Sequence, residues 1–180
     1  INGDIERSKL FDEIFVQPAS GDAGVAIGAC YLAHKAQKPE YMPKKMHNFY
    51  LGSKFQNQEI EKAFSKRNLE AVQPDDLLSR TAARLSEGRI VGWFQGGAEF
   101  GPRALGNRSI LTRPFPADMK DYLNMRVKFR EEFRPFAPAV LIDYFSEYFE
   151  IGQESPHMLI ACQATEKARQ EIPATVHVDG

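Results

Sequence analysis

The chain has 180 residues, of which 43% are hydrophobic and 26% are charged, a composition typical of a soluble globular protein of one or two domains. Its formal net charge of −1 gives no overall attraction to nucleic acid or to an anionic membrane, so recognition of a charged ligand requires a local cluster. We find no apolar run long enough to span a bilayer, no signal peptide and no lipidation motif, so we expect a cytoplasmic protein without a membrane partner.

Two cysteines, Cys30 and Cys162, lie far apart in apolar surroundings. A single widely spaced pair is neither a disulfide framework nor a metal quartet, so we expect reduced thiols in the core. The first residue is Ile1, which leaves open that the chain is a piece of a longer protein.

The predicted elements alternate between helices and strands. The apolar run 14–16 predicts a buried strand, and a helix follows over 23–38 with Asp22 as its N-cap or first-turn carboxylate. Residues 39–51 show neither period and predict a connection. The later predicted elements are helices at 58–68, 78–85, 118–127 and 143–149 and strands at 90–94, 110–112, 136–141, 158–161 and 175–178. This pattern indicates a mixed α/β (α+β) fold class.

The most informative motif is the glycine-rich loop 95–109, which directly follows a predicted strand. Its four glycines and a proline leave the backbone free to wrap around a ligand, with N–H groups that can form an anion nest. Arg103 and Arg108 can pair with phosphate oxygens, and Asn107 and Ser109 add neutral donors. The loop matches neither the Walker nor the dinucleotide pattern. It predicts a phosphate site, and a structural turn with solvated arginines is the alternative.

A local excess of positive charge supports the phosphate site. From Arg103 to Arg134 there are eight Lys and Arg residues against four acids. Over 128–136 the cations alternate with phenylalanines, which indicates cations held against apolar walls, where their attraction to a phosphoanhydride is less screened. We assign no functional role to Glu131 and Glu132, for which a solvated run of charges at the surface is the alternative interpretation.

Several ordered motifs resemble one family. EFGPRALGNRSIL at 99–111, then MKDYLN, KFRE, FRPFAP, SPHM and HVDG, resembles the C-terminal region of carbamoyltransferases of the NodU and tobramycin type. QPASGDAGVAIGA at 17–29 resembles the end of the N-terminal domain of the same proteins. The resemblance covers about 15–180. The pair Gly97-Ala98 departs from it, since a bulkier Arg-Met pair is expected there, and this affects the packing of that turn.

The resemblance implies two kinds of domain. Residues 1–45 would be the C-terminal remnant of an actin/hsp70-type ATPase-fold domain, 46–75 a linker and helix, and 76–180 an incomplete YrdC-like twisted-sheet domain. In such enzymes the YrdC-like domain makes carbamoyl adenylate and pyrophosphate from carbamoyl phosphate and ATP with Mg²⁺. The other domain passes the carbamoyl group to an alcohol acceptor, a hydroxyl of a small molecule or sugar. We expect the 180-residue chain alone to be inactive.

The resemblance also assigns roles to single residues. Arg103, Lys128 and Arg134 would be the catalytic cations that hold the phosphates. Asp22 would be a ligand of a divalent or iron-type metal whose histidine ligands lie outside this chain, and a helix cap alone is the alternative. The residues expected to bind substrate or ATP are Gly101, Arg103, Asn107, Arg108, Ser109, Lys128, Arg130, Arg134 and His177.

The histidines differ in their sequence surroundings. His177 and Asp179 alternate to one face of a predicted strand, as a base and its orienting carboxylate would, and a structural donor is the alternative. His34 and His47 are expected at the surface or in the linker.

Two other functions compete with carbamoyl transfer. A nucleotide- or RNA-binding module without catalysis would use the basic loops, although the lack of net positive charge disfavours nucleic acid. An assembly domain would use a set of aromatic residues as a subunit interface, although their spacing is more simply that of core residues. A homodimer is a possible oligomeric state. The aromatics concerned are Phe133, Phe136, Phe145, Tyr148 and Phe149.

Overall fold

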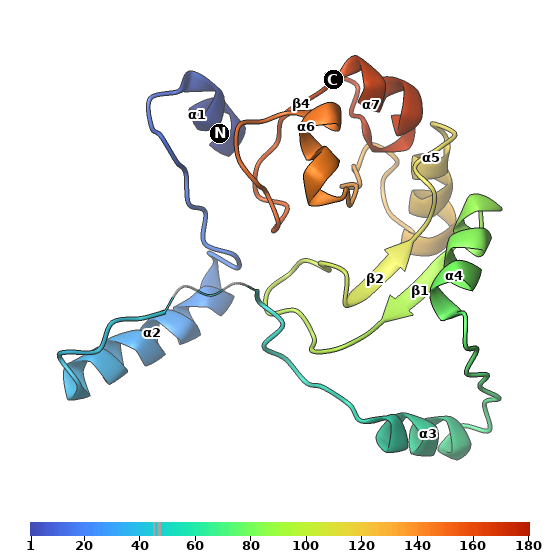
Figure 1. Cartoon of the computed structure of the whole chain (residues 1–180), viewed down its shortest axis with the longest axis horizontal. Coiled ribbons are helices and arrows are strands. Elements are labelled where there is room, and N and C mark those ends of the chain that lie inside the picture. Colours follow the sequence, from blue (N-terminus) through green and yellow to red (C-terminus); the bar gives the residue numbers. More distant parts are fainter. Residues whose placement is uncertain (45, 47) are drawn as a thin grey trace. The chain divides into compact units, whose positions relative to one another are not determined.

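The computed structural model describes residues 1–44, 46 and 48–180, which form two units (Figure 1). The continuous unit is Val16–Leu111, and the split unit joins Ile1–Phe15 to Thr112–Gly180. The predictions for His47 and for the domain boundary at Lys45 fall on residues outside those described, and the three predicted domains stay predictions. Helices and small sheets occur together, so the predicted mixed α/β class is confirmed.

The helices of the continuous unit lie where the sequence predicts them. They are α2 (Asp22–Gln37), α3 (Asn57–Lys66) and α4 (Leu77–Ser86). Asp22 lies in the first turn of α2, where a carboxylate is favoured by the partial positive charge of the helix N-terminus. At the start of α3 the Glu59 carboxylate accepts a hydrogen bond from the backbone N–H of Gln56 at 2.8 Å.

A two-stranded antiparallel sheet frames the glycine-rich loop (Figure 1). Its strands are β1 (Val91–Phe94) and β2 (Arg108–Leu111), and the register pairs Trp93 with Ser109 and Phe94 with Arg108. Strand β2 therefore begins before the predicted strand 110–112. The earlier start places Arg108 and Ser109 on the sheet, at the point where the loop returns.

The split unit contains short elements around a small core. In chain order they are α1 (Asn2–Ser8), α5 (Met119–Leu123), the π-helix η1 (Asn124–Lys128), the 3₁₀-helix η2 (Ile142–Tyr144), α6 (Phe145–Tyr148), β3 (Phe149–Glu150), β4 (Gln163–Ala164), α7 (Glu166–Glu171) and the 3₁₀-helix η3 (Pro173–Thr175). The predicted helices 118–127 and 143–149 are thus helical, but each changes its helix type partway. Ala164, Ala168 and Ile172 form the buried core cluster.

Four predicted strands are wrong, because an apolar run does not specify a partner for its backbone. Residues 14–16 are irregular, and the side chain of Gln153 takes the place of a neighbouring strand. Its Oε1 accepts the N–H of Ile14 at 3.1 Å and its Nε2 donates to the Ile14 carbonyl at 2.8 Å. Both backbone groups of Ile14 are satisfied without a sheet.

The other three wrong strands also have local reasons. Residues 136–141 are irregular before η2, and Pro138 within them lacks the N–H that a sheet ladder needs. In 158–161 the Leu159 carbonyl accepts a hydrogen bond from the Asn2 side chain at 2.8 Å instead of a strand partner. Thr175 is the last residue of the 3₁₀-helix η3, and the residues after it lead into a turn in which the Gly180 N–H donates to the His177 carbonyl at 3.0 Å.

The prediction that Cys30 belongs to the core is wrong for the described chain. Cys30 is exposed on α2, a helix without a buried residue. Cys162 is half-buried, and burial raises the pKa of its thiol. Among the aromatics expected in the core, Phe133 is 70% exposed. Within the described residues no helix combines the length and the apolar character that crossing a bilayer requires.

Candidate anion-binding loops

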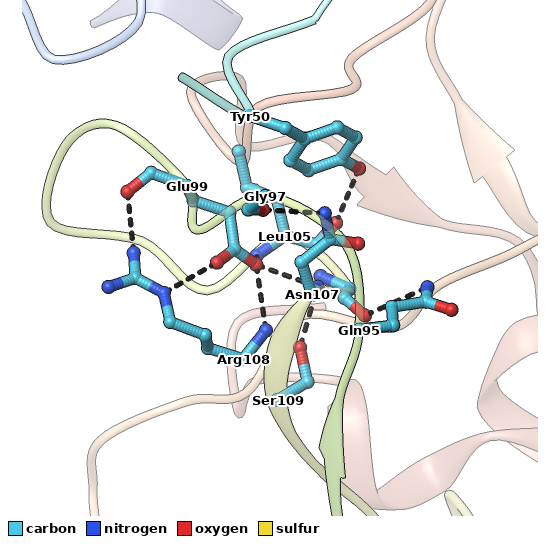
Figure 2. A network of polar contacts seen from close by, with 9 residues as sticks. Tyr50, Gln95, Gly97, Glu99, Leu105, Asn107, Arg108 and Ser109 are labelled. Carbon is cyan, nitrogen blue, oxygen red and sulfur yellow. Dashed lines mark hydrogen bonds and ion pairs between the residues drawn. The ribbon is translucent and has the colours of Figure 1, made fainter. Parts of the chain in front are cut away.

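A buried carboxylate organises the glycine-rich loop (Figure 2). Oε1 of Glu99 accepts three backbone hydrogen bonds, from Leu105 at 2.7 Å, Asn107 at 2.8 Å and Arg108 at 3.1 Å. Oε2 accepts from Nε of Arg108 at 2.8 Å. The Glu99 side chain is completely buried, whereas that of Arg108 is 43% exposed. The loop backbone thus forms an anion nest, and the anion inside it is the protein's own carboxylate.

The electrostatics of Glu99 follow from this geometry. Burial by itself raises the pKa of the carboxyl group, but the hydrogen bonds from Arg108, Leu105 and Asn107 outweigh it and lower the pKa from 4.5 to about 2. Glu99 is therefore ionised at every physiological pH, and its charge is matched by Arg108.

The neutral donors of the loop are also used within it (Figure 2). Asn107 is buried, and its Nδ2 donates to the Gly97 carbonyl at 2.7 Å. The hydroxyl of Ser109 accepts the N–H of Gly106 at 3.0 Å. The hydroxyl of Tyr50 donates to the Leu105 carbonyl at 2.9 Å. The predicted ligands Asn107, Arg108 and Ser109 therefore meet one another in a single network, and their role toward a ligand stays a prediction.

Arg103 differs from these residues. Its side chain is exposed and makes no hydrogen bond or ion pair with any part of the chain that the structure describes. The turn before it depends on Gly101, whose φ of +106° is a backbone conformation that favours glycine. A Cβ at Gly101 would lie 2.7 Å from the Cβ of Ala19, so the close approach also requires glycine.

A second loop, 124–136, follows the same plan in the split unit. Asn124 is fully buried, and its Nδ2 donates to the carbonyls of Glu132 at 3.2 Å and Arg134 at 2.9 Å. Its Oδ1 accepts from Nε of Arg130 at 2.6 Å. The guanidinium of Arg130 lies 4.6 Å from the centre of the Phe136 ring, which confirms the predicted contact between a cation and an apolar wall.

The cations of this second loop also divide into held and exposed ones. Burial, together with the charge of Arg134, lowers the pKa of Arg130, although the guanidinium stays protonated at any physiological pH. Arg134 is exposed and lies 3.7 Å from Glu131, which gives this acid the partner that the sequence left unassigned. Lys128 is exposed, and its side chain makes no hydrogen bond or ion pair within the described residues.

The predicted catalytic cations lie in different units. Arg103 belongs to the continuous unit, and Lys128 and Arg134 belong to the split unit. That the three cations converge on one ligand therefore stays a prediction.

Asp22 and His177 occupy exposed positions. Asp22 begins α2, and the described residues contain no group of three or more His, Cys, Asp or Glu side chains that could hold a metal. The residues of this chain alone therefore do not fit a complete metal site. Nδ1 of His177 lies 2.8 Å from Oδ1 of Asp179, and this hydrogen bond lowers the pKa of the Asp179 carboxyl group. The predicted pairing of these two residues is present, although in a turn instead of a strand.

Two residues that organise the loops, Glu99 and Asn124, were not predicted from the sequence. The sequence feature that could have indicated them is a polar side chain at the start of an irregular segment, whose backbone N–H and C=O groups need partners. Neither lies on a helical or alternating pattern with its partners, which are six to ten positions further along the chain.

Comparison with known proteins identifies the family. The carbamoyltransferase C-terminus family model matches residues 82–180, and the carbamoyltransferase N-terminus model matches residues 1–31. The chain is similar to nodulation protein NolNO of Sinorhizobium fredii, with 41% identity over 100% of this chain and 27% of the relative. It is 40% identical to nodulation protein NolO of Bradyrhizobium diazoefficiens, over 100% of this chain and 34% of the relative.

The same likeness extends to other relatives. An uncharacterized protein of Synechocystis is 40% identical over 99% of this chain and 34% of its own length, and nodulation protein U of Rhizobium tropici is 37% identical over 99% and 29%. The chain thus spans about a third of the length of these relatives. Because the C-terminal family model alone matches more than half of the 180 residues, including both basic loops, the chain belongs to the carbamoyltransferase family.

Proposed function

We propose that the protein carrying this chain is an ATP-dependent O-carbamoyltransferase of the cytoplasm, which uses ATP with Mg²⁺. Membership of the carbamoyltransferase family supports carbamoyl transfer. We further propose that the region from 76 onward is YrdC-like and that residues 1–45 end an actin/hsp70-type domain. The acceptor would be a hydroxyl of a small molecule or sugar.

The proposed reaction has two stages. Water first releases phosphate from carbamoyl phosphate and leaves carbamate. A carbamate oxygen then attacks the α-phosphorus of ATP, which forms carbamoyl adenylate and expels pyrophosphate. In the second stage the acceptor hydroxyl attacks the carbamoyl carbon, AMP leaves with the bonding electron pair, and the hydroxyl proton passes to solvent or a base.

The first stage brings two polyanions together, so the site must offset their repulsion and the charge on the leaving pyrophosphate. Fixed cations can do this. The observation that carries the proposal is the exposed side chain of Arg103. The other arginine of its loop, Arg108, is neutralised by Glu99, so Arg103 is the arginine of that loop whose charge is available to a ligand. Lys128 and Arg134 would supply further charge to the same phosphates.

Gly101 and His177 complete the proposed ligand set, Gly101 through the close approach of its backbone and His177 through its exposed ring. Asp22 would contribute one carboxylate to a metal site completed by residues of the whole protein.

The test is release of pyrophosphate by the full-length protein with ATP, carbamoyl phosphate and Mg²⁺, without an acceptor alcohol. We expect Arg103→Ala to lower kcat/KM by about tenfold to a hundredfold, the usual effect of removing one charge-assisted contact. Arg67→Ala is the matched control, since Arg67 is also exposed in the continuous unit, and it should leave the rate unchanged.

Two results would contradict the proposal. One is full-length protein that binds RNA tightly and releases no pyrophosphate, which would favour a binding module. The other is efficient carbamoyl-phosphate-dependent turnover by the 180-residue chain alone, which would mean that the active site is misplaced.

A further inference from the structure

The two arginines of the glycine-rich loop are in opposite situations. Arg108 donates through Nε to the buried Glu99 carboxylate and through its Nη2 to the Glu99 carbonyl. Arg103, five residues earlier, has no partner among the described residues. A difference of this kind between neighbouring cations points to a division of roles.

We propose that Glu99 is a positioning residue that holds Arg103 for anion binding, and that Arg108 acts through Glu99 instead of binding the ligand. This inference rests on the proposed function. Under this proposal Arg108 is not a ligand of the phosphates, and the acidic residue Glu99 takes part in building an anion site.

Figure 2 shows the hydrogen bonds through which Glu99 would act on the loop that carries Arg103. Glu99 starts a short loop, and its own carboxylate accepts the N–H of Leu105, where the loop returns, at 2.7 Å. The Tyr50 hydroxyl donates to the carbonyl of the same Leu105 at 2.9 Å. Arg103 therefore lies in a short segment, 99–105, whose two ends are joined by the hydrogen bond from Leu105 to Glu99, and the turn at Gly101 sets the direction of its backbone.

The same bonds explain why Arg108 is a poor ligand for phosphate. Its Nε and Nη2 are already committed to Glu99. If binding of a phosphate drew Arg108 away from Glu99, the buried carboxylate would lose its counter-ion next to a second anion. The three backbone N–H groups of the nest are likewise occupied by Oε1 of Glu99.

A double-mutant cycle in the full-length protein tests the proposal, with the KM for carbamoyl phosphate in pyrophosphate release as readout. Glu99→Gln keeps the size of the side chain but places an amide donor or a weaker acceptor opposite Arg108. We expect Glu99→Gln to raise KM by about tenfold, in line with the loss of a charge-assisted bond. In an Arg103→Ala background the same change should leave KM within about twofold, because the residue it positions is gone.

The second cycle tests Arg108 itself. Arg108→Met should raise KM in the wild type but have no further effect in the Glu99→Gln background. If Arg108 binds the phosphate directly, its effect will persist in both backgrounds, and the proposal is wrong. Equal, additive losses of kcat for Glu99→Gln with and without Arg103 would indicate a purely structural role and would also overturn it.

A readout without catalysis separates this inference from the proposed function. Trypsin should cut the Arg103–Ala104 bond several-fold faster in Glu99→Gln than in the wild type, because the loop is released, and cutting at Arg67–Asn68 should not change. An unchanged rate at Arg103 contradicts the positioning role even if the enzyme is active. An absence of pyrophosphate release by the wild type, with faster cutting in Glu99→Gln, contradicts the proposed function alone. If Glu99→Gln does not fold, Arg108→Met provides the same comparison.

Discussion

The buried ion pair between Glu99 and Arg108 predicts how the stability of the continuous unit depends on pH. The pKa of Glu99 is lowered from 4.5 to about 2, because the hydrogen bonds from Arg108 and the loop backbone outweigh the opposing effect of burial. A carboxyl group with a lowered pKa in the folded state stabilises the protein above its unfolded pKa. This stabilisation is lost as the pH falls from about 4.5 to about 2.

The magnitude follows from the same values. A shift of this size corresponds to roughly 3 kcal/mol at neutral pH. Water reaches the Arg108 side chain, which is 43% exposed, and screens part of the interaction, so we expect about 2 kcal/mol. Glu99→Gln should lose that amount of unfolding free energy at pH 7, and the difference from the wild type should shrink as the pH falls below about 4.5.

Trp93 provides the assay, because it is the single tryptophan of the chain and lies in β1, opposite Ser109. Urea unfolding followed by its fluorescence therefore reports on the continuous unit. Glu61→Gln, an exposed change on α3, serves as the control and should have little effect at any pH. A difference between wild type and Glu99→Gln that stays constant from pH 7 to pH 2.5 would refute the reasoning, because the charge of Glu99 would then not matter.

Three further predictions concern other parts of the chain. Asn124→Ala should destabilise the protein by about 2 to 4 kcal/mol in urea unfolding followed by circular dichroism, since three hydrogen bonds of a buried amide are lost. Gly101→Ala should cost at least about 1 to 2 kcal/mol in the same tryptophan assay, because its φ is positive and the new Cβ would meet Ala19; an unchanged midpoint would contradict this. Cys30 should react with a thiol reagent faster than Cys162, whose exposure is lower and whose thiol pKa is raised by burial; mass spectrometry of the first product decides this.

Helices were predictable from the sequence where a local signal was sufficient. The helix α2 begins at Asp22 and α4 ends two residues before Gly88, whose φ of +80° suits a helix terminus. The strand predictions were wrong where the backbone hydrogen-bonding groups of an apolar run could find partners outside a sheet. At Ile14 the side chain of Gln153, 139 positions away, was the alternative, and no local pattern can indicate such a partner.

The candidate site shows the same limit. The residue types in the glycine-rich loop indicated a backbone nest for an anion, and a nest is present. The sequence could not indicate that the anion in it is Glu99, since this depends on how the loop closes through positive φ angles at Gly101 and Gly106. Because the loop closes in this way, Arg108 forms an ion pair with Glu99 and is not one of the free cations.

The split unit has a consequence for the order in which the chain acquires structure during its synthesis. Helix α1 is tied to the far end of the chain through Asn2 and Leu159 and through Glu6, whose carboxylate accepts the N–H of Gly152 at 2.9 Å, 146 positions later. At a ribosomal rate of about 5 to 20 residues per second, these partners emerge roughly 7 to 30 seconds after α1. The continuous unit, whose residues are made without interruption, has its contacts available first. We expect α1 to lack these two partners during that interval, so a pause in translation before residue 150 should leave residues 1–15 more open to proteolysis than in the finished protein, while the segment around Glu99 is already protected.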